Sequence, residues 1–170
     1  TESETELKEA YEWLVQCVTT MKPEIVTDEI IDNMAQGRKA LGLCYSGDAT
    51  YIMSENENMG FYMPSEGTNR WYDAMVIPAN AENPQLAHEF INFVCEYDVA
   101  YGNSAYVGYT SPNQEVMEDL SGEGGDYEGI NAYLPRSHYE MDEVFVYNAE
   151  TRKIISNLWS KVKIAASNAE

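Results

Sequence analysis

Apolar residues recur along this chain at two different spacings, and the combination restricts the fold it can adopt. Between Leu7 and Met21 they return every three or four positions, which predicts an amphipathic helix, with Ser3 and Glu6 placed as its capping box. Residues 40–45 are instead short and almost wholly apolar, as is typical of a strand buried on both faces of a sheet. A helix followed by a buried strand indicates an α/β fold.

The rest of the chain continues this pattern of helices and short strands. We expect further helices over 28–35, through 49–53, from Pro84 to Tyr97, over 98–106, from a cap and proline within 111–114, and over 150–167. We expect strands near 60–63 and over 71–77, a turn at 64–67, and a glycine-rich acidic loop at 121–126.

Length and charge limit the class of partner. With 170 residues, 44% of them hydrophobic, the chain can form one ordinary domain or two small lobes around a core. The 10 basic residues against 29 acidic ones give a net charge of -19, so the surface repels nucleic acid, phosphate and anionic membranes and attracts cations. Acidity also serves solubility, so charge alone names no partner.

The sequence contains no run of membrane-spanning length and no secretory leader. Thr1 begins almost directly in the first expected helix, so we expect the chain to be part of a longer protein. Cys17, Cys44 and Cys95 lie in apolar contexts, which predicts small buried hydrophobes rather than metal ligands or disulfides.

Residues 69–78 place aromatic rings and a carboxylate at the mouth of an apolar segment. Alternation along a strand puts Trp71, Asp73, Met75 and Ile77 on one face. A tryptophan and an aspartate on the same face combine a flat π surface with a fixed negative charge. That combination suits an organic cation.

Signals for catalysis are weak. His88 and His138 are far apart in sequence and lie in no nucleophile or metal motif, so we expect surface or structural roles for both. The sequence has no G-x-S-x-G, phosphate loop, C-x-x-C or H-E-x-x-H. Its many carboxylates could supply a glycosidase pair by chance, which makes any chosen pair uninformative. We therefore expect no enzyme, no cofactor and no metal site, with a carboxylate-dependent glycosidase as an alternative.

Four residues at the ends of expected elements are candidates for a ligand site: Tyr45, Trp71, Asp73 and Tyr109. Ligand crevices of open α/β sheets form at such ends. Taken singly, Trp71 and Tyr109 are more often explained by packing in the core or at its rim, and an aspartate beside a strand is usually a cap or lies in a turn. The four indicate a site only if they converge in space.

The stretch from Leu41 to Asn113 resembles the second half of the polyamine-binding proteins, which are extracytoplasmic receptors of spermidine and putrescine ABC transporters. The segments that carry the resemblance are 42–49 (GLCYSGDA), 64–67 (PSEG), 71–81 (WYDAMVIPANA) and 108–113 (GYTSPN). The spacings between these segments also resemble those of the family. Weaker similarity extends over residues 91–93 and the first and last helices, so the resemblance covers most of the chain.

The resemblance implies roles for the four candidates. An aromatic residue at the place of Tyr45 and a tryptophan at the place of Trp71 line the polyamine channel in that family. The aspartate at the place of Asp73 pairs with an ammonium, and the tyrosine at the place of Tyr109 closes the site. The family often has tryptophan where this chain has Tyr45, so the resemblance does not specify which polyamine is bound.

A further polar contact of the family falls among Glu143, Phe145 and Tyr147, which the resemblance does not separate. The resemblance also implies a partial periplasmic-binding-protein-like fold of type II that lacks the N-terminal part of the receptor. Residues 1–70 would be the later part of lobe two, 71–135 the returning segment of lobe one, and 136–170 a C-terminal segment whose helix docks on lobe two.

The implied partners are a polyamine and an ABC transporter permease, with no nucleic acid, and with membrane contact only through an anchor or the permease. The implied location is periplasmic or extracellular, in association with the cell membrane. A fragment with exposed lobe surfaces could also dimerise. A receptor of the same fold for a sugar, an amino acid or a metal complex stays open, since aromatic platforms also stack sugar rings.

Overall fold

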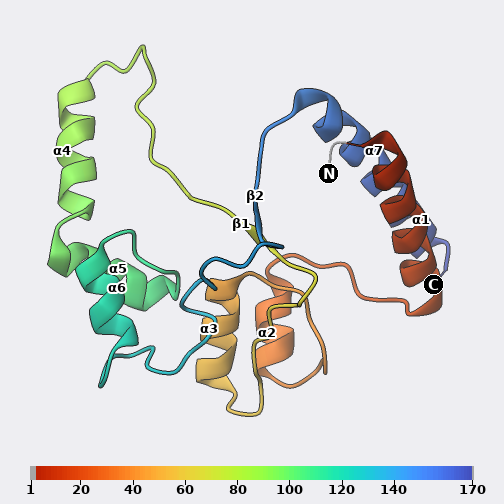
Figure 1. Cartoon of the computed structure of the whole chain (residues 1–170), viewed down its shortest axis with the longest axis horizontal. Coiled ribbons are helices and arrows are strands. Elements are labelled where there is room, and N and C mark those ends of the chain that lie inside the picture. Colours follow the sequence, from red (N-terminus) through yellow and green to blue (C-terminus); the bar gives the residue numbers. More distant parts are fainter. Residues whose placement is uncertain (1–2, 170) are drawn as a thin grey trace. The chain divides into compact units, whose positions relative to one another are not determined.

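The computed structural model describes residues 3–169, and helices dominate this part of the chain (Figure 1). The helices are α1 (Glu4–Thr20), α2 (Glu29–Ala35), α3 (Ser46–Glu55), α4 (Pro84–Val94), α5 (Tyr97–Val107), α6 (Gln114–Ser121) and α7 (Ala149–Ser167), and the strands are β1 (Asn69–Arg70) and β2 (Glu143–Val144). The described chain forms two compact units: residues 3–26 with 145–169, and residues 27–144.

The first unit is a pair of packed helices, α1 and α7. Leu7 and Val18 of α1 and Val162 of α7 are its buried apolar side chains. The Ser3 hydroxyl accepts the Glu6 N–H at 3.5 Å, so the predicted cap of α1 is confirmed. These three residues belong to the apolar stripes that the periodicity predicts, although Ile155 and Trp159 on the stripe of α7 are exposed.

The second unit contains a small apolar core between α5 and α6, which lie side by side in Figure 1. This α5–α6 core consists of Ala100, Val116, Leu120 and Tyr133. The Tyr133 hydroxyl and the buried Ser104 hydroxyl share a hydrogen bond of 2.8 Å. The two hydroxyls buried at this core are therefore paired with each other.

A second packed region of this unit joins α2 to α3. Ala49 and Ile52 of α3 are buried, and the Asn56 side chain at the end of α3 donates to the Ala35 carbonyl at the end of α2 at 3.0 Å. This packing holds α3, whose N-cap is the candidate residue Tyr45.

The sheet of the described chain is a short parallel pair, in which Asn69 lies opposite Glu143 and Arg70 opposite Val144. The expected turn before β1 is confirmed by a hydrogen bond of 3.2 Å from the Gly67 N–H to the Pro64 carbonyl. Gly67 has φ +100°, a conformation that favours glycine.

The predicted helices at 28–35, 98–106 and 150–167 are confirmed, and so is the helix that begins at Pro84. The helix predicted over 98–106 also ends before Gly108, as expected. The expected helix at 84–97 ends earlier, at Val94, and Tyr97 begins α5. The helix expected to open at 111–114 is capped by Asn113, because its side chain accepts the N–H groups of Glu115 and Val116. Thr1, where the chain was expected to begin a helix, lies outside the described residues.

The predicted strands at 40–45, 60–63 and 71–77 are wrong for the described chain. Residues 41–45 belong to no strand, and the Leu41 and Leu43 side chains are 86% and 98% exposed rather than buried on both faces. A strand needs a neighbour to pair its backbone, and in residues 3–169 the pairing is that of β1 with β2. The described chain therefore contains less β-sheet than the predicted α/β fold requires.

The cysteine prediction is also wrong in part, because Cys95 is exposed, whereas Cys17 and Cys44 are half-buried. Within residues 3–169, no helix has both the length and the apolar character that a membrane crossing requires.

Candidate functional site

Tyr45 stands at the start of α3, where it is the N-cap residue with an extended backbone (φ -76°, ψ 158°). Its side chain is 60% exposed, so the ring is presented to solvent rather than packed in a core. The buried face of α3 holds the helix start in place beneath it.

Two glycines allow Tyr109 to lie against this helix start. Gly108 ends α5 in the left-handed conformation (φ +72°), and Tyr109 follows it directly. A Cβ atom on Gly47 would lie 2.2 Å from the Tyr109 ring, which no side chain tolerates. Gly47 therefore lets the phenol ring pack on the first turn of α3.

Trp71 lies between the two tyrosines. Its ring centroid is 5.1 Å from that of Tyr45 and 6.2 Å from that of Tyr109, with interplanar angles of 63° and 74°. These are edge-to-face contacts, the arrangement that the aromatic quadrupole favours. Tyr45, Trp71 and Tyr109 thus form one ring cluster, built from the start of α3, the segment after β1 and the end of α5.

Asp73 follows Trp71 by two residues, and its side chain is exposed. Its charge acts on the Tyr109 phenol: burial is the main cause that raises the pKa of Tyr109 to about 12, and Asp48, Tyr45 and Asp73 raise it further. The phenol therefore stays protonated at neutral pH and remains a hydrogen-bond donor. The structure places the three predicted rings together, with the predicted carboxylate within electrostatic range of one of them.

Asp48 is a second carboxylate at this cluster, and it is not among the four predicted site residues. Burial raises the pKa of Asp48, although a backbone hydrogen bond from Tyr45 and a side-chain hydrogen bond from Tyr109 act in the opposite direction. The nearby charge of Asp28 raises the pKa further. A partly desolvated carboxylate that accepts a phenol hydrogen bond gains from the approach of a cation.

The sequence pattern that could have indicated Asp48 is a capping box, and it is incomplete because the cap residue is Tyr45. Asp48 occupies the third position of α3 and reaches back to the N-cap backbone, which is half of a capping box. The other half requires serine or threonine at the cap, and this chain has Tyr45 there. Cys44 is half-buried beside these groups, and burial, then the Asp48 charge, raises the pKa of its thiol.

The arrangement offers aromatic edges and faces, a neutral phenol donor and two carboxylates within one region of the second unit. Such a set suits an organic cation with an apolar body. Within the described residues, no three histidine, cysteine or acidic side chains gather as metal ligands. The two histidines stand apart from the cluster in sequence, and His138 adopts a positive φ of 53° in the loop before β2.

Curated relatives of this chain carry names of polyamine receptors. The spermidine/putrescine-binding periplasmic protein of Salmonella typhimurium is 30% identical over 118 residues, which are 69% of this chain and 34% of that protein. The spermidine/putrescine-binding periplasmic protein of Escherichia coli is 34% identical over 88 residues, 52% of this chain and 25% of that protein. A putrescine-binding periplasmic protein of E. coli is 24% identical over 144 residues, 81% of this chain and 38% of that protein.

The chain thus spans about a third of the length of the curated relatives it matches. No solved structure matches it. The model of one protein family, described as bacterial extracellular solute-binding protein, matches residues 2–128. Because that match covers well over half of the 170 residues, the chain belongs to the family of bacterial extracellular solute-binding proteins.

Proposed function

We propose that this chain is part of the polyamine receptor of an ABC transporter, an extracytoplasmic protein that binds spermidine- or putrescine-type ligands and performs no catalysis. One observation carries the proposal: Tyr45, Trp71 and Tyr109 form a single ring cluster that has carboxylates beside it. The printed names of the relatives, which include both spermidine and putrescine receptors, support the same ligand class.

The chemistry of the ligand explains the composition of the site. A polyamine at neutral pH is a methylene chain with a positive charge at each nitrogen, so its site needs carboxylates at the nitrogens and apolar walls between them. Trp71 and the two tyrosines would pack against the methylenes and attract the neighbouring ammonium groups, at about 0.5–2 kcal/mol for each cation–π contact. Asp73 would pair with one ammonium.

Asp48 would take a second ammonium, on the α3 side of the cluster. Its carboxylate already accepts the Tyr109 hydroxyl, and burial makes the charged form costly until a cation arrives. Two carboxylates around one ring cluster would distinguish a polyamine from a monoamine, because the second charge of the ligand gains a partner.

The proposed architecture is that of a type II periplasmic-binding-protein-like fold, of which this chain holds part. We propose that 1–70 and 136–170 belong to lobe two and 71–135 to lobe one. The permease would be the protein partner, and closure of the lobes around the ligand would be the signal to it. The location would be periplasmic or extracellular at the cell membrane, and isolated pieces with exposed lobe surfaces would dimerise.

Isothermal titration tests the ligand class. Spermidine and putrescine should each give saturable heat with a receptor of full length that contains this chain, whereas sucrose should give none. Asp73→Asn should weaken polyamine binding at least about tenfold, the equivalent of about 1.4 kcal/mol. Asp126→Asn, which removes an exposed carboxylate of the glycine-rich loop, is the matched control and should leave affinity unchanged. Heat with the sugar and none with either polyamine would remove the proposal.

A further inference from the structure

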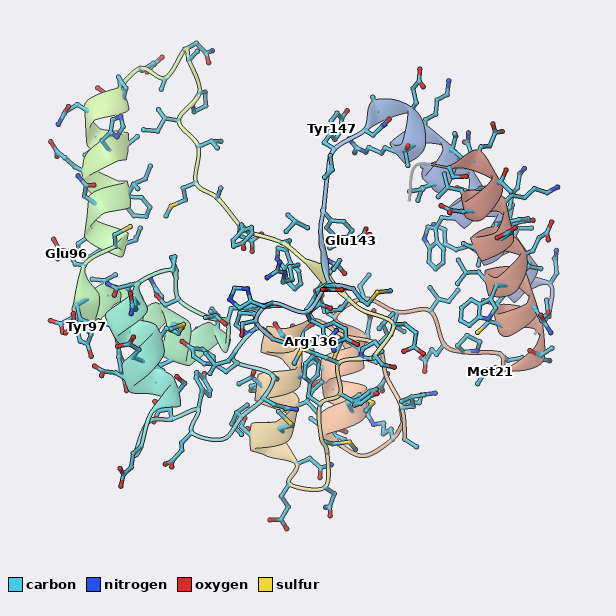
Figure 2. The ribbon with its side chains drawn as sticks, viewed as in Figure 1. Met21, Glu96, Tyr97, Arg136, Glu143 and Tyr147 are labelled. Carbon is cyan, nitrogen blue, oxygen red and sulfur yellow. The ribbon has the colours of Figure 1, made fainter. Side chains whose placement is uncertain are left out.

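Arg136, which is labelled in Figure 2, forms an enclosed ion pair with Asp142 in the second unit. The Arg136 Nε donates to Asp142 Oδ2 at 2.9 Å and its Nη2 donates to Asp142 Oδ1 at 2.5 Å. The Asp142 side chain is 2% exposed and that of Arg136 19%. Two parallel charge-assisted hydrogen bonds in this setting fix both the distance and the orientation of the partners.

The same guanidinium also holds the turn that precedes β1. Arg136 donates to the carbonyls of Met63 at 3.4 Å and Pro64 at 3.0 Å. Its Cζ lies 3.7 Å from the centre of the Tyr139 ring, and the Tyr139 hydroxyl donates to the Ser65 carbonyl at 2.7 Å. Three consecutive carbonyls of the turn are therefore bound by two side chains of the 136–142 loop.

Asp142 extends this connection into β1. Its Oδ1 accepts the Thr68 N–H at 2.9 Å, and the Glu143 N–H donates to the Thr68 carbonyl at 3.0 Å. A Cβ atom on Gly67 would lie 2.0 Å from the Met141 carbonyl oxygen, so the two segments are in direct backbone contact. The paired strand β1 then ends at Arg70, and the next residue is Trp71.

Arg70 adds a second positive charge near the pair. The Arg136 hydrogen bond is the main cause that lowers the pKa of Asp142; the Thr68 backbone hydrogen bond and the Arg136 and Arg70 charges lower it as well. The Nε of Arg70 and the Nδ2 of Asn69 are buried without a partner in the described part of the chain. The side chains of β1 therefore add no hydrogen bond through these two atoms, and the strand before Trp71 is held by its backbone pairing with β2 and by the contacts of Thr68.

We propose that Arg136 and Asp142 are positioning residues of the ligand site. Their ion pair fixes residues 63–70 and so holds the Trp71 indole in place between Tyr45 and Tyr109. The claim that this placement matters for a polyamine rests on the proposed function, whereas the claim that the pair places the indole stands without it. Neither residue needs to touch the ligand.

A general stabilising role of the pair makes a different prediction from a positioning role. If the pair only stabilised the fold, a variant that remains folded would keep Trp71 in its present contacts. If it positions Trp71, a folded variant would show a more exposed indole and a weaker site. The measurement must therefore report on Trp71 itself.

In a receptor of full length that contains this chain, replacing Trp13, Trp159 and any tryptophan outside these 170 residues with phenylalanine makes Trp71 the single reporter. Trp13 and Trp159 are 65% and 40% exposed, so a variant with Trp13→Phe and Trp159→Phe should fold. In this background, Asp142→Asn should raise the acrylamide quenching of Trp71 about twofold and weaken spermidine binding at least about tenfold. Arg136→Lys, which keeps the charge but loses the paired hydrogen bonds, should do the same to a smaller extent.

Lys8→Met is the control, because it removes the exposed Lys8–Glu12 pair at 3.9 Å on α1 and should change neither readout. Unchanged quenching of Trp71 in folded Asp142→Asn would overturn the proposal. If far-ultraviolet circular dichroism shows that Asp142→Asn is unfolded, the Trp71 quenching is measured in Arg136→Lys and Tyr139→Phe instead. Wild-type quenching in both variants would overturn the proposal. If the parent binds no spermidine, the proposed function fails, and the quenching still decides the positioning.

Discussion

Two clusters of aromatic side chains lie in the same unit of this protein, and they differ in exposure and charge. Tyr133 is 1% exposed, stacks on Tyr127 at 4.5 Å, and pairs its hydroxyl with Ser104 at 2.8 Å. In the ring cluster, Tyr45 is 60% exposed and touches Trp71 edge to face at 5.1 Å. Carboxylates lie beside the ring cluster, whereas the Tyr133 hydroxyl in the α5–α6 core is paired with Ser104.

The difference teaches how to separate packing from recognition. In the α5–α6 core each polar atom named above has a protein partner, so adding a ligand there would displace existing contacts. In the ring cluster, aromatic surface stays open and the Asp48 carboxylate is partly desolvated. Such a surface gains free energy when a cation covers it, and that gain is what a binding site requires.

The largest expected effect is a loss of stability from a substitution in the α5–α6 core. Leu120 is 0% exposed, so Leu120→Ala should lower the free energy of unfolding by about 2–5 kcal/mol through lost burial and a cavity. Tyr45→Ala should change it by less than about 1 kcal/mol, because most of the ring is already in water, but it should weaken polyamine binding. Urea unfolding and calorimetric titration of both variants measure the contrast. Equal losses of stability would contradict the division into core and site.

Gly47→Ala should impair the site and leave the core intact. The added methyl would lie 2.2 Å from the Tyr109 ring, so the ring must move away from α3. We expect affinity for spermidine to fall about tenfold, while the free energy of unfolding changes by less than about 1 kcal/mol, since alanine also favours the helix. Gly102→Ala is the control, because a Cβ there meets no atom within 4 Å. Wild-type affinity in Gly47→Ala would contradict the placement of Tyr109 in the site.

Asp48 should make polyamine binding depend on pH, because its pKa is raised by burial. Its pKa is raised in the folded protein, so affinity should be full well above the ordinary aspartate value of about 3.9 and should fall as the pH drops through the raised value. Ligand binding should then release protons, because the cation favours the ionised form. Titrations in buffers of different ionisation enthalpy measure this release. Asp48→Asn should abolish the Asp48 part of it, and an unchanged release would assign the effect to another group.

The smallest expected effect is a loss of stability when a buried hydroxyl is removed from the α5–α6 core. Tyr133→Phe removes the buried hydroxyl that pairs with Ser104, and we expect a loss of about 1 kcal/mol in unfolding free energy. Spermidine affinity should stay the same, since Tyr133 belongs to the α5–α6 core. A loss of affinity without a loss of stability would show that the two clusters are coupled.

The sequence predicted the helices better than the strands, for a physical reason. Periodicity and caps are local signals, and they located α1, α4 and α7 as well as the end of α5 at Gly108. A strand depends on a partner elsewhere in the chain, so the prediction of a buried strand at 40–45 is wrong, and Leu43 is 98% exposed. The same limit applies to 71–77, where Val76 is 81% exposed.

The candidate site was predictable only in part. Residue type and position at the ends of elements selected Tyr45, Trp71 and Tyr109, and the structure brings their rings together. Their convergence is a tertiary property that spacing does not contain. Asp48 was missed because its hydrogen-bond partners are the Tyr45 backbone and the distant Tyr109 side chain. The ligand roles of these residues remain predictions.

The most direct test of the central claim is a fluorescence titration of the receptor of full length in which Trp13, Trp159 and any tryptophan outside these 170 residues are replaced by phenylalanine, so that Trp71 is the reporter. We predict a saturable change of Trp71 emission with spermidine, none with sucrose, and a shift to at least about tenfold higher spermidine concentration in Asp73→Asn. Calorimetric binding of spermidine with no change in Trp71 emission would contradict the account.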